Sequence, residues 1–352
     1  MSEIDRRIFL AGAGAVAGAA TLAPAAARAR EGGWTAGPDM PWPVQEIYAA
    51  QHAGDIYVAG GLMARPGEPL HIEDRVAILE PGTGRWRQGP RLPAPRHHPM
   101  LIAGDADLYV MGGYARSEAG EWTNTTTGWV LAEGAWKPIA PLPSPQAEAV
   151  GVGWGETLHL ITGRTPAGEA NGNWNDQADT DRHLIYRIGD DRWEVGRPCP
   201  MARNSAAAAA LDGAIWVAGG RTVSGGGTGR LDRYTPSEDR WDTLAPIPAS
   251  EATGQQVGGG LALAAVSGRL VAFGGEWFRP RSEGGGGGVF RETWIYTLAD
   301  DAWTRGTDMR TPRHGLAGIG VEDTVYAIAG GAVVSGGRAT ATVETWTPSS
   351  FY

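Results

Sequence analysis

The sequence predicts an all-β protein, a six-bladed β-propeller, on two observations. Tryptophans followed by a proline-rich step recur six times along the 352-residue chain, at Trp34, Trp86, Trp136, Trp193, Trp241 and Trp303. Apolar segments between them end in glycine pairs whose second members recur every 50 to 57 residues, at Gly61, Gly113, Gly163, Gly220, Gly275 and Gly331. A repeat of this length indicates one four-stranded blade per copy.

Residues 95–139 show how one copy builds a blade. Two apolar segments, 100–103 and 108–111, flank a Gly-Asp turn and predict the two inner strands. Residues 129–131 predict the third strand, and Trp136 begins the fourth. The paired glycines suit a crowded strand end, where the backbone adopts positive φ or approaches another backbone closely. We expect each tryptophan to pack between neighbouring blades.

The sixth copy lacks its outer strand, because the chain ends soon after Thr347-Pro348. The segment Gly33-Trp34-Thr35 resembles the missing strand. We therefore expect the N-terminal strand to complete the last blade and close the ring, which removes the open sheet edges.

The first 29 residues predict a cleaved leader. Arg6-Arg7 precedes an Ala- and Gly-rich stretch, and Ala27-Arg28-Ala29 offers a small-x-small cleavage site. The pattern resembles a twin-arginine signal peptide and implies a periplasmic or secreted protein, with the propeller in residues 30–352. The alternative, an uncleaved membrane anchor, is disfavoured because the stretch is only mildly hydrophobic.

Composition limits the partners. The formal net charge is −9, which argues against nucleic acid and, after cleavage of the leader, against a membrane. Cys199 is the only cysteine, so no intramolecular disulfide can form. The candidate ligands that remain are a small carbohydrate and a protein partner.

Polar residues at the starts of the innermost strands are the first set of candidate site residues. Loops at this end of a propeller meet over the central channel. The candidates are Glu46, Arg96, His97, His98, Glu148, Arg203, Asn204, Arg313 and His314. The fifth copy instead has Gly258-Gly259-Gly260, which we expect to leave room for a ligand.

Loops after the glycine pairs give the second set: Arg164, Trp174, Arg221, Glu276, Trp277, Arg279 and Arg281. Long loops on a rigid scaffold commonly carry binding residues. Tryptophans in such loops suit stacking on sugar rings. The glycine run at 284–288 is either a lid hinge or a slack insertion.

Several candidates have a structural alternative. Arg96, Arg203 and Arg313 recur at one repeat position, so they either bind substrate or tie the blades together. The histidines lack a metal-ligand spacing, and residues 171–181 do not match a calcium loop. We therefore expect no metal and no cofactor.

The repeat resembles the kelch repeat. In fold only, the chain also resembles the central domain of galactose oxidase, whose copper site needs two Tyr, two His and a Cys–Tyr crosslink. Here Cys199 precedes a strand and no Tyr starts an inner strand. We therefore do not expect copper oxidase chemistry.

Gly275-Glu276, with Arg279 and Arg281 nearby, resembles the periplasmic N-acetylneuraminate epimerase family of kelch mutarotases, although the Arg spacing differs. The resemblance implies mutarotation or epimerisation of an acidic carbohydrate. Glu276 would be the base, and His97, His98 or His314 the acid. Arg164, Arg221 or Arg279 would hold the substrate carboxylate.

The predicted function is binding of a small, acidic carbohydrate at the channel mouth, with its mutarotation or epimerisation left open. Two alternatives are a non-catalytic protein-interaction module and a lectin. An interaction module predicts a large exposed apolar patch. A catalytic pocket predicts that Glu276, His98 and His314 converge over the channel.

Overall fold

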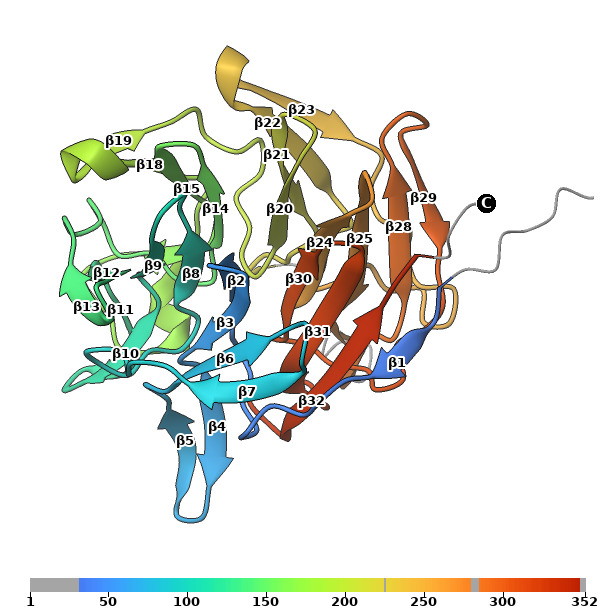
Figure 1. Cartoon of the computed structure of the whole chain (residues 1–352). Helices are drawn as coiled ribbons and strands as arrows, with labels where there is room; N and C mark the ends of the chain where they lie inside the picture. The colour runs from blue at the N-terminus through green and yellow to red at the C-terminus, as the bar shows by residue number, and fades with distance from the viewer. Residues whose placement is uncertain (1–31, 225, 280–284, 349–352) are drawn as a thin grey trace, which may run out of the picture.

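The computed structural model describes residues 32–224, 226–279 and 285–348. They form six four-stranded antiparallel sheets around a central axis (Figure 1). Each innermost strand contacts the innermost strands of both neighbouring sheets, so the ring is closed. The six-bladed propeller predicted from the repeat is confirmed. The predicted leader, residues 1–29, lies outside the described residues.

The first three blades follow the predicted order of strands from the axis outward. Their strands are β2 (Ala49–His52), β3 (Asp55–Ala59), β6 (Val76–Glu80) and β7 (Arg85–Gln88); β8 (Met100–Ala103), β9 (Leu108–Met111), β12 (Gly128–Ala132) and β13 (Ala135–Pro138); and β14 (Val150–Trp154), β15 (Thr157–Ile161), β18 (His183–Arg187) and β19 (Arg192–Val195).

The fourth and fifth blades repeat this order, and the sixth uses the N-terminal strand. The strands are β20 (Ala207–Leu211), β21 (Ala214–Ala218), β22 (Leu231–Thr235) and β23 (Arg240–Leu244); β24 (Leu261–Val266), β25 (Arg269–Gly274), β28 (Thr293–Thr297) and β29 (Ala302–Arg305); and β30 (Ala317–Val321), β31 (Thr324–Gly331), β32 (Ala339–Trp346) and β1 (Trp34–Ala36). Trp34 pairs with Trp346, which confirms the predicted closure.

Four of the loops after the glycine pairs fold into two-stranded hairpins. They are β4 (Leu62–Arg65) with β5 (Glu68–Ile72), β10 (Tyr114–Ser117) with β11 (Gly120–Asn124), β16 (Arg164–Pro166) with β17 (Gln177–Asp179), and β26 (Glu276–Phe278) with β27 (Gly287–Val289). Figure 1 shows the β4–β5 hairpin extending away from the ring. The described part of the glycine run therefore includes a paired strand.

The helices in the described ranges are three single 3-10 turns, Trp174–Asp176, Ile188–Asp190 and Pro236–Glu238. None of the helices found there is long and apolar enough to span a membrane.

Six clusters of buried apolar side chains hold the ring together, one between each pair of neighbouring blades. The repeated tryptophans add a polar contact to this packing. In five of them, Trp86, Trp136, Trp193, Trp241 and Trp303, the indole Nε1 donates to a backbone carbonyl of the preceding blade at 2.8–3.0 Å. Because each indole has an apolar body and one donor, the residue suits a half-buried seam.

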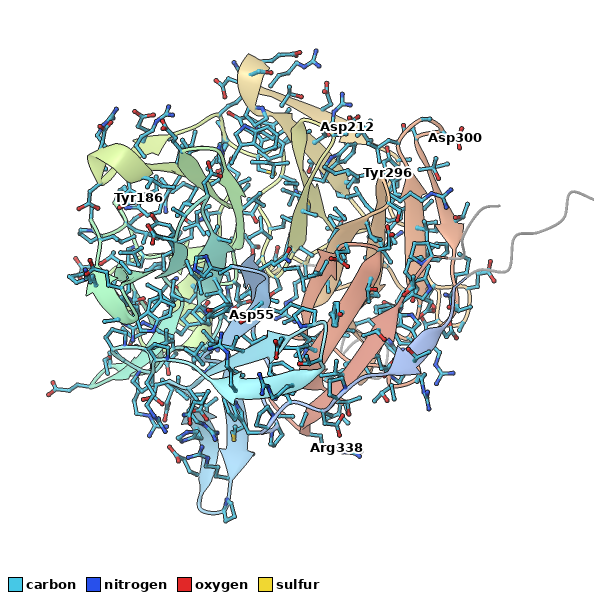
Figure 2. All side chains as sticks on the ribbon, viewed as in Figure 1. Asp55, Tyr186, Asp212, Tyr296, Asp300 and Arg338 are labelled. Carbon is cyan, nitrogen blue, oxygen red and sulfur yellow. The ribbon has the colours of Figure 1, made fainter. Side chains whose placement is uncertain are left out.

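A tyrosine also fixes the outer turn in three blades. Tyr186, Tyr234 and Tyr296 donate their hydroxyls to Asp191, Asp239 and Asp301, respectively, at 2.6–2.9 Å. Figure 2 labels Tyr186 and Tyr296. Each aspartate has a left-handed backbone, with φ of 45–46°. The backbone of each aspartate therefore forms the turn, and its carboxylate accepts the hydrogen bond from the tyrosine hydroxyl.

The glycine pairs have positive φ in both members, as at Gly112 (60°) and Gly113 (78°). A Cβ on Gly113 would lie 2.9 Å from the His97 carbonyl oxygen, so close backbone approach requires glycine there. In the sixth blade the corresponding pair is Ala329 (52°) and Gly330 (100°). The sequence prediction of Gly330-Gly331 was wrong by one residue, because Ala329 adopts the left-handed backbone of the first position.

Candidate functional site

One residue at the start of each innermost strand has a left-handed backbone. The six are Glu46, His98, Glu148, Ser205, Gly260 and Gly315, with φ between 49° and 71°. We call them the mouth ring. This conformation costs a non-glycine residue roughly 1 kcal/mol or more. Four blades nevertheless place a polar side chain there, which marks the ring as a candidate site.

Backbone hydrogen bonds link members of the mouth ring in succession. Five amides donate to the carbonyl of the ring residue in the preceding blade: Glu46 to Gly315, His98 to Glu46, Ser205 to Glu148, Gly260 to Ser205 and Gly315 to Gly260, at 2.7–3.1 Å. The side chains of the ring are thus carried on a backbone that has little freedom to shift.

A cavity of about 480 Å³ opens above the ring. Its lining combines carboxylates, one arginine and one histidine with aromatic and aliphatic side chains. The lining residues are Glu46, Leu62, Leu70, His98, Trp122, Glu148, Trp174, Arg221, Thr222, Val223, Glu276, Phe278, Ser335 and Gly336. Apolar walls with a few convergent polar groups are typical of small-molecule sites.

Glu46 and His98 form an ion pair on the cavity floor, with Nε2 of His98 2.9 Å from Oε2 of Glu46. Burial opposes charge on both groups, but each stabilises the charge of the other. The pKa of Glu46 is lowered to about 2, with contributions from His98, His314 and Arg221. The pKa of His98 is raised above 6.5, chiefly by Glu46 against the opposing effect of burial.

His97 lies behind this pair and fixes the orientation of His98. Its Nε2 is 3.0 Å from the Glu121 carbonyl oxygen, which can only accept, so Nε2 carries a proton. Burial and the neighbouring His98 lower the pKa of His97 to about 3, so its Nδ1 is an acceptor. Nδ1 of His98, 2.9 Å away, therefore donates to it. Only Nε2 of His98 then remains to exchange a proton with Glu46 or a ligand.

Glu148 is fully buried and multiply bonded. It accepts hydrogen bonds from the Tyr114 hydroxyl at 3.0 Å and the Ser205 hydroxyl at 2.7 Å. Arg164 and Arg221 lie 3.5 and 3.6 Å from its carboxylate. Burial raises the pKa of Glu148, but His98 and the two arginines outweigh that effect and lower it. These contacts fix Glu148 as a permanent negative charge at the mouth.

Glu276 pairs with Arg221 and accepts the Ser335 backbone amide at 2.8 Å. His314 donates from Nε2 to the carbonyls of Val333 and Ser335 at 2.8 and 3.0 Å. Its Nδ1 lies 3.5 Å from both Glu46 and Glu276. The structure thus brings Glu276, His98 and His314 together around Glu46.

The room left by Gly259 is filled from within the protein. A Cβ there would lie 2.9 Å from Nε of Arg221, so the arginine crosses directly over this glycine. The expectation that the glycines of the fifth blade leave space for a ligand was wrong. Gly259 makes room for Arg221, and added Cβ atoms on Gly258 and Gly260 would meet the backbone of Glu276 and Gly315.

The recurring arginines point into their own blades. Arg96 donates to the Pro95 carbonyl and the Thr127 hydroxyl. Arg203 pairs with buried Asp232 at 2.8 Å and donates to the Val217 carbonyl at 3.2 Å. Arg313 donates to the carbonyls of Thr342 and Ala327. None of the three lines the cavity, and each bonds within its own blade, so these contacts match neither of the two roles left open, substrate binding or tying the blades together.

Other candidates lie at the edge of the site or outside it. Trp174 lines the cavity, and buried Arg164 stacks beneath it with 3.9 Å from Cζ to the ring centroid. Asn204 supports the site by accepting from Arg221 and donating to Asp179. Trp277 packs on the apolar cluster between blades 4 and 5, and exposed Arg279 lies over it. Arg281 lies outside the described residues.

Sequence reasoning missed four participants. Tyr114 follows a glycine pair at the same position as Arg164, Arg221 and Glu276, which was an available signal. Trp122 and Phe278 are aromatic residues in loops after glycine pairs, the criterion that selected Trp174. Ser335 contributes a backbone amide, for which the sequence carries no signal.

Within the described ranges, no group of three or more His, Cys, Asp or Glu side chains has the arrangement of a metal site.

Comparisons with known proteins match this architecture. The kelch motif matches residues 202–248, in the fourth blade. The kelch-like protein terF of Aspergillus terreus is 24% identical over 315 residues, 87% of this chain and 65% of terF. Beta-scruin of Limulus polyphemus is 27% identical over 213 residues, 60% of this chain and 21% of beta-scruin. The chain thus aligns with less than two thirds of these relatives' lengths.

Among solved structures, YjhT superimposes with a TM-score of 0.73 and 15% identity, covering 88% of this chain and 97% of YjhT. At this identity the similarity concerns the fold. The closed ring of six blades and this superposition identify the fold as a six-bladed β-propeller, and the fourth blade carries a kelch motif.

Proposed function

We propose that this protein binds a small carbohydrate in the mouth cavity and exchanges its anomers by acid/base catalysis. The observation that carries the proposal is the Glu46–His98 pair, 2.9 Å apart on the floor of a cavity walled by Trp122, Trp174 and Phe278. Aromatic rings pack against the apolar faces of sugars, and a paired acid and base serve ring opening.

The pair can supply both proton transfers of mutarotation. Nε2 of His98 donates its proton to the ring oxygen while the Glu46 carboxylate takes the proton of the anomeric hydroxyl. The bond between the ring oxygen and the anomeric carbon breaks, and a carbonyl forms. Rotation and the reverse transfers close the ring as the other anomer, so no co-reactant is consumed. As His98 loses its charge, Glu46 becomes more basic, which couples the two transfers.

Glu276 takes a different role from the one its sequence context implied. Its side chain is only 4% exposed and is engaged by Arg221 and by the Ser335 amide, whereas the Glu46 side chain is 14% exposed. We therefore assign the base to Glu46. Glu276 positions Arg221 and the loop at residues 332–338.

The cellular location belongs to the same proposal. The Arg6-Arg7 leader supports export to the periplasm or the medium. A protein-interaction module is less well supported. Among the described residues, the exposed large hydrophobic side chains are Val195, Val223 and Phe278, and two of these line the cavity.

The test is anomer exchange measured by NMR on a panel of neutral, amino and acidic sugars, including N-acetylneuraminate. Wild-type protein is compared with Glu46→Gln and with a surface control, Glu194→Gln. We expect exchange above the buffer rate for at least one sugar, reduced about 100-fold or more by Glu46→Gln and unchanged in the control. Exchange at the buffer rate for every sugar would overturn catalysis. Binding without exchange would leave a lectin.

A further inference from the structure

The charges around the cavity floor limit what the site can bind. Three carboxylates line it, those of Glu46, Glu148 and Glu276. A fourth, Asp179, lies behind the lining, where it accepts from the Asn204 amide at 2.5 Å and from the backbone amide of the lining residue Val223 at 2.7 Å. This inference rests on the proposed function and names the class of carbohydrate that the site selects.

The cations on the floor are committed to these carboxylates. Arg221 binds Glu276 and Asn204 and lies 3.6 Å from Glu148. Arg164 is fully buried, donates to the carbonyls of Trp174 and Gln177, and lies 3.5 Å from Glu148. Arg164 is therefore out of reach of a ligand, whereas Arg221 lines the cavity with its side chain 19% exposed but already uses Nη1 for Glu276 and Nε for Asn204.

The balance of charge is at most neutral. Four carboxylates face two guanidiniums, so the set is negative unless both His98 and His314 are protonated. If both histidines are protonated, the net charge of this set is zero. An anionic ligand would therefore enter without net attraction and would break existing ion pairs, and leaving a buried carboxylate unpaired is strongly unfavourable.

A cationic ligand finds suitable partners. Glu46 is the most exposed of the three lining carboxylates, and its low pKa keeps it ionised at neutral pH. Phe278 is 42% exposed, and Trp122 lines the same cavity. Aromatic faces and a carboxylate together are the features that recognise an ammonium group.

We infer that the mouth cavity selects sugars with a free amine, whose ammonium group pairs with Glu46, and discriminates against sugar acids. The sequence had favoured an acidic carbohydrate because the arginines were expected to be free to bind it. The structure pairs those arginines with the protein's own carboxylates.

The test uses three probes that share one ring: glucosamine, glucose and glucuronate. Binding to the wild-type protein is measured by isothermal titration calorimetry at pH 7 and low salt. We expect glucosamine to bind about tenfold more tightly than glucose, and glucuronate to bind most weakly. Added salt should weaken glucosamine binding and leave glucose binding unchanged.

Two variants test whether Glu46 is the residue that causes the preference for glucosamine. Glu46→Gln should abolish the preference for glucosamine over glucose, whereas Glu194→Gln, on the surface of β19, should retain it. If Glu46→Gln does not fold, the order of the three probes on the wild-type protein still decides. Tightest binding by glucuronate would overturn this inference and leave the proposed function standing. Binding by none of the three, nor by any sugar of the NMR panel, would overturn the proposed function and this inference with it.

Discussion

Gly315 and Glu46 meet at the channel mouth, where a Cβ on Gly315 would lie 2.7 Å from the Glu46 carboxyl group. The Gly315 carbonyl also accepts the Glu46 backbone amide at 2.7 Å. The missing side chain in the sixth blade therefore makes space for the carboxylate of the first blade. This space lets Glu46 reach both His98 and His314.

Gly315→Ala should displace Glu46 and impair the site beyond its cost to folding. The φ of +55° costs an alanine roughly 1 kcal/mol. Gly213→Ala is the matched control, since Gly213 has φ of +75° and no heavy atom within 4 Å of its added Cβ. We expect similar backbone strain in both variants by urea unfolding, but a fall of about tenfold or more in sugar affinity only for Gly315→Ala. Equal affinity in the two variants would contradict the relationship.

The Glu46–His98 pair should make stability depend on pH. Because the folded pKa of His98 is raised above its unfolded value near 6.5, its contribution is full below pH 6.5 and is lost as pH rises through the folded pKa. Glu46 has the opposite sign, contributing above pH 4.5 and losing that contribution as pH falls toward 2.

Thermal unfolding of wild type and His98→Gln between pH 5 and 9 measures the first effect. We expect the wild type's advantage to be largest at pH 5 and to shrink toward pH 9. A difference that is constant over this range would show that His98 does not gain a proton on folding.

His97 should act as a positioning residue for His98. His97→Phe keeps a ring of similar shape but removes the acceptor that holds the Nδ1 proton of His98. We expect kcat for anomer exchange to fall about tenfold or more with KM little changed, and the pH profile to shift. His97→Gln, which can both donate and accept, should restore part of the rate. A parallel loss in both variants, with an unshifted profile, would indicate a purely structural role.

The fold could be predicted from the sequence because each signal is local. The tryptophan steps and glycine pairs fix turns and seams within one repeat, and their spacing gives the blade count. The error at the sixth glycine pair has the same origin. The predicted pair, Gly330 and Gly331, is conspicuous in sequence, but Ala329 adopts the required left-handed backbone with φ of 52°.

The site could be predicted only in part, because it depends on partners from different blades. Glu46, Glu148, His98 and Glu276 were selected because they sit at strand starts or after a glycine pair. The sequence did not show which charged side chains are already paired with other residues of the protein. The arginine after a glycine pair, Arg221, enters the mouth, whereas Arg203 before an inner strand turns into its own blade. There Arg203 pairs with the buried carboxylate of Asp232 on β22, the third strand after it in the sequence.

Arg203 should therefore matter for folding and not for the ligand. Arg203 and Asp232 are both fully buried and 2.8 Å apart, so removing the guanidinium leaves a buried carboxylate with Arg230 as its remaining ion-pair partner and the Thr243 hydroxyl as a neutral donor. Arg203→Met should lower the free energy of unfolding by about 3 kcal/mol or more. Arg192→Met, at a half-exposed surface pair, should cost less than about 1 kcal/mol. Urea unfolding gives both values, and calorimetry gives sugar affinity per folded molecule. Because Arg203 does not line the cavity, the sugar affinity of the folded protein should be unchanged in both variants. A loss of affinity in folded Arg203→Met would show that Arg203 contributes to ligand binding.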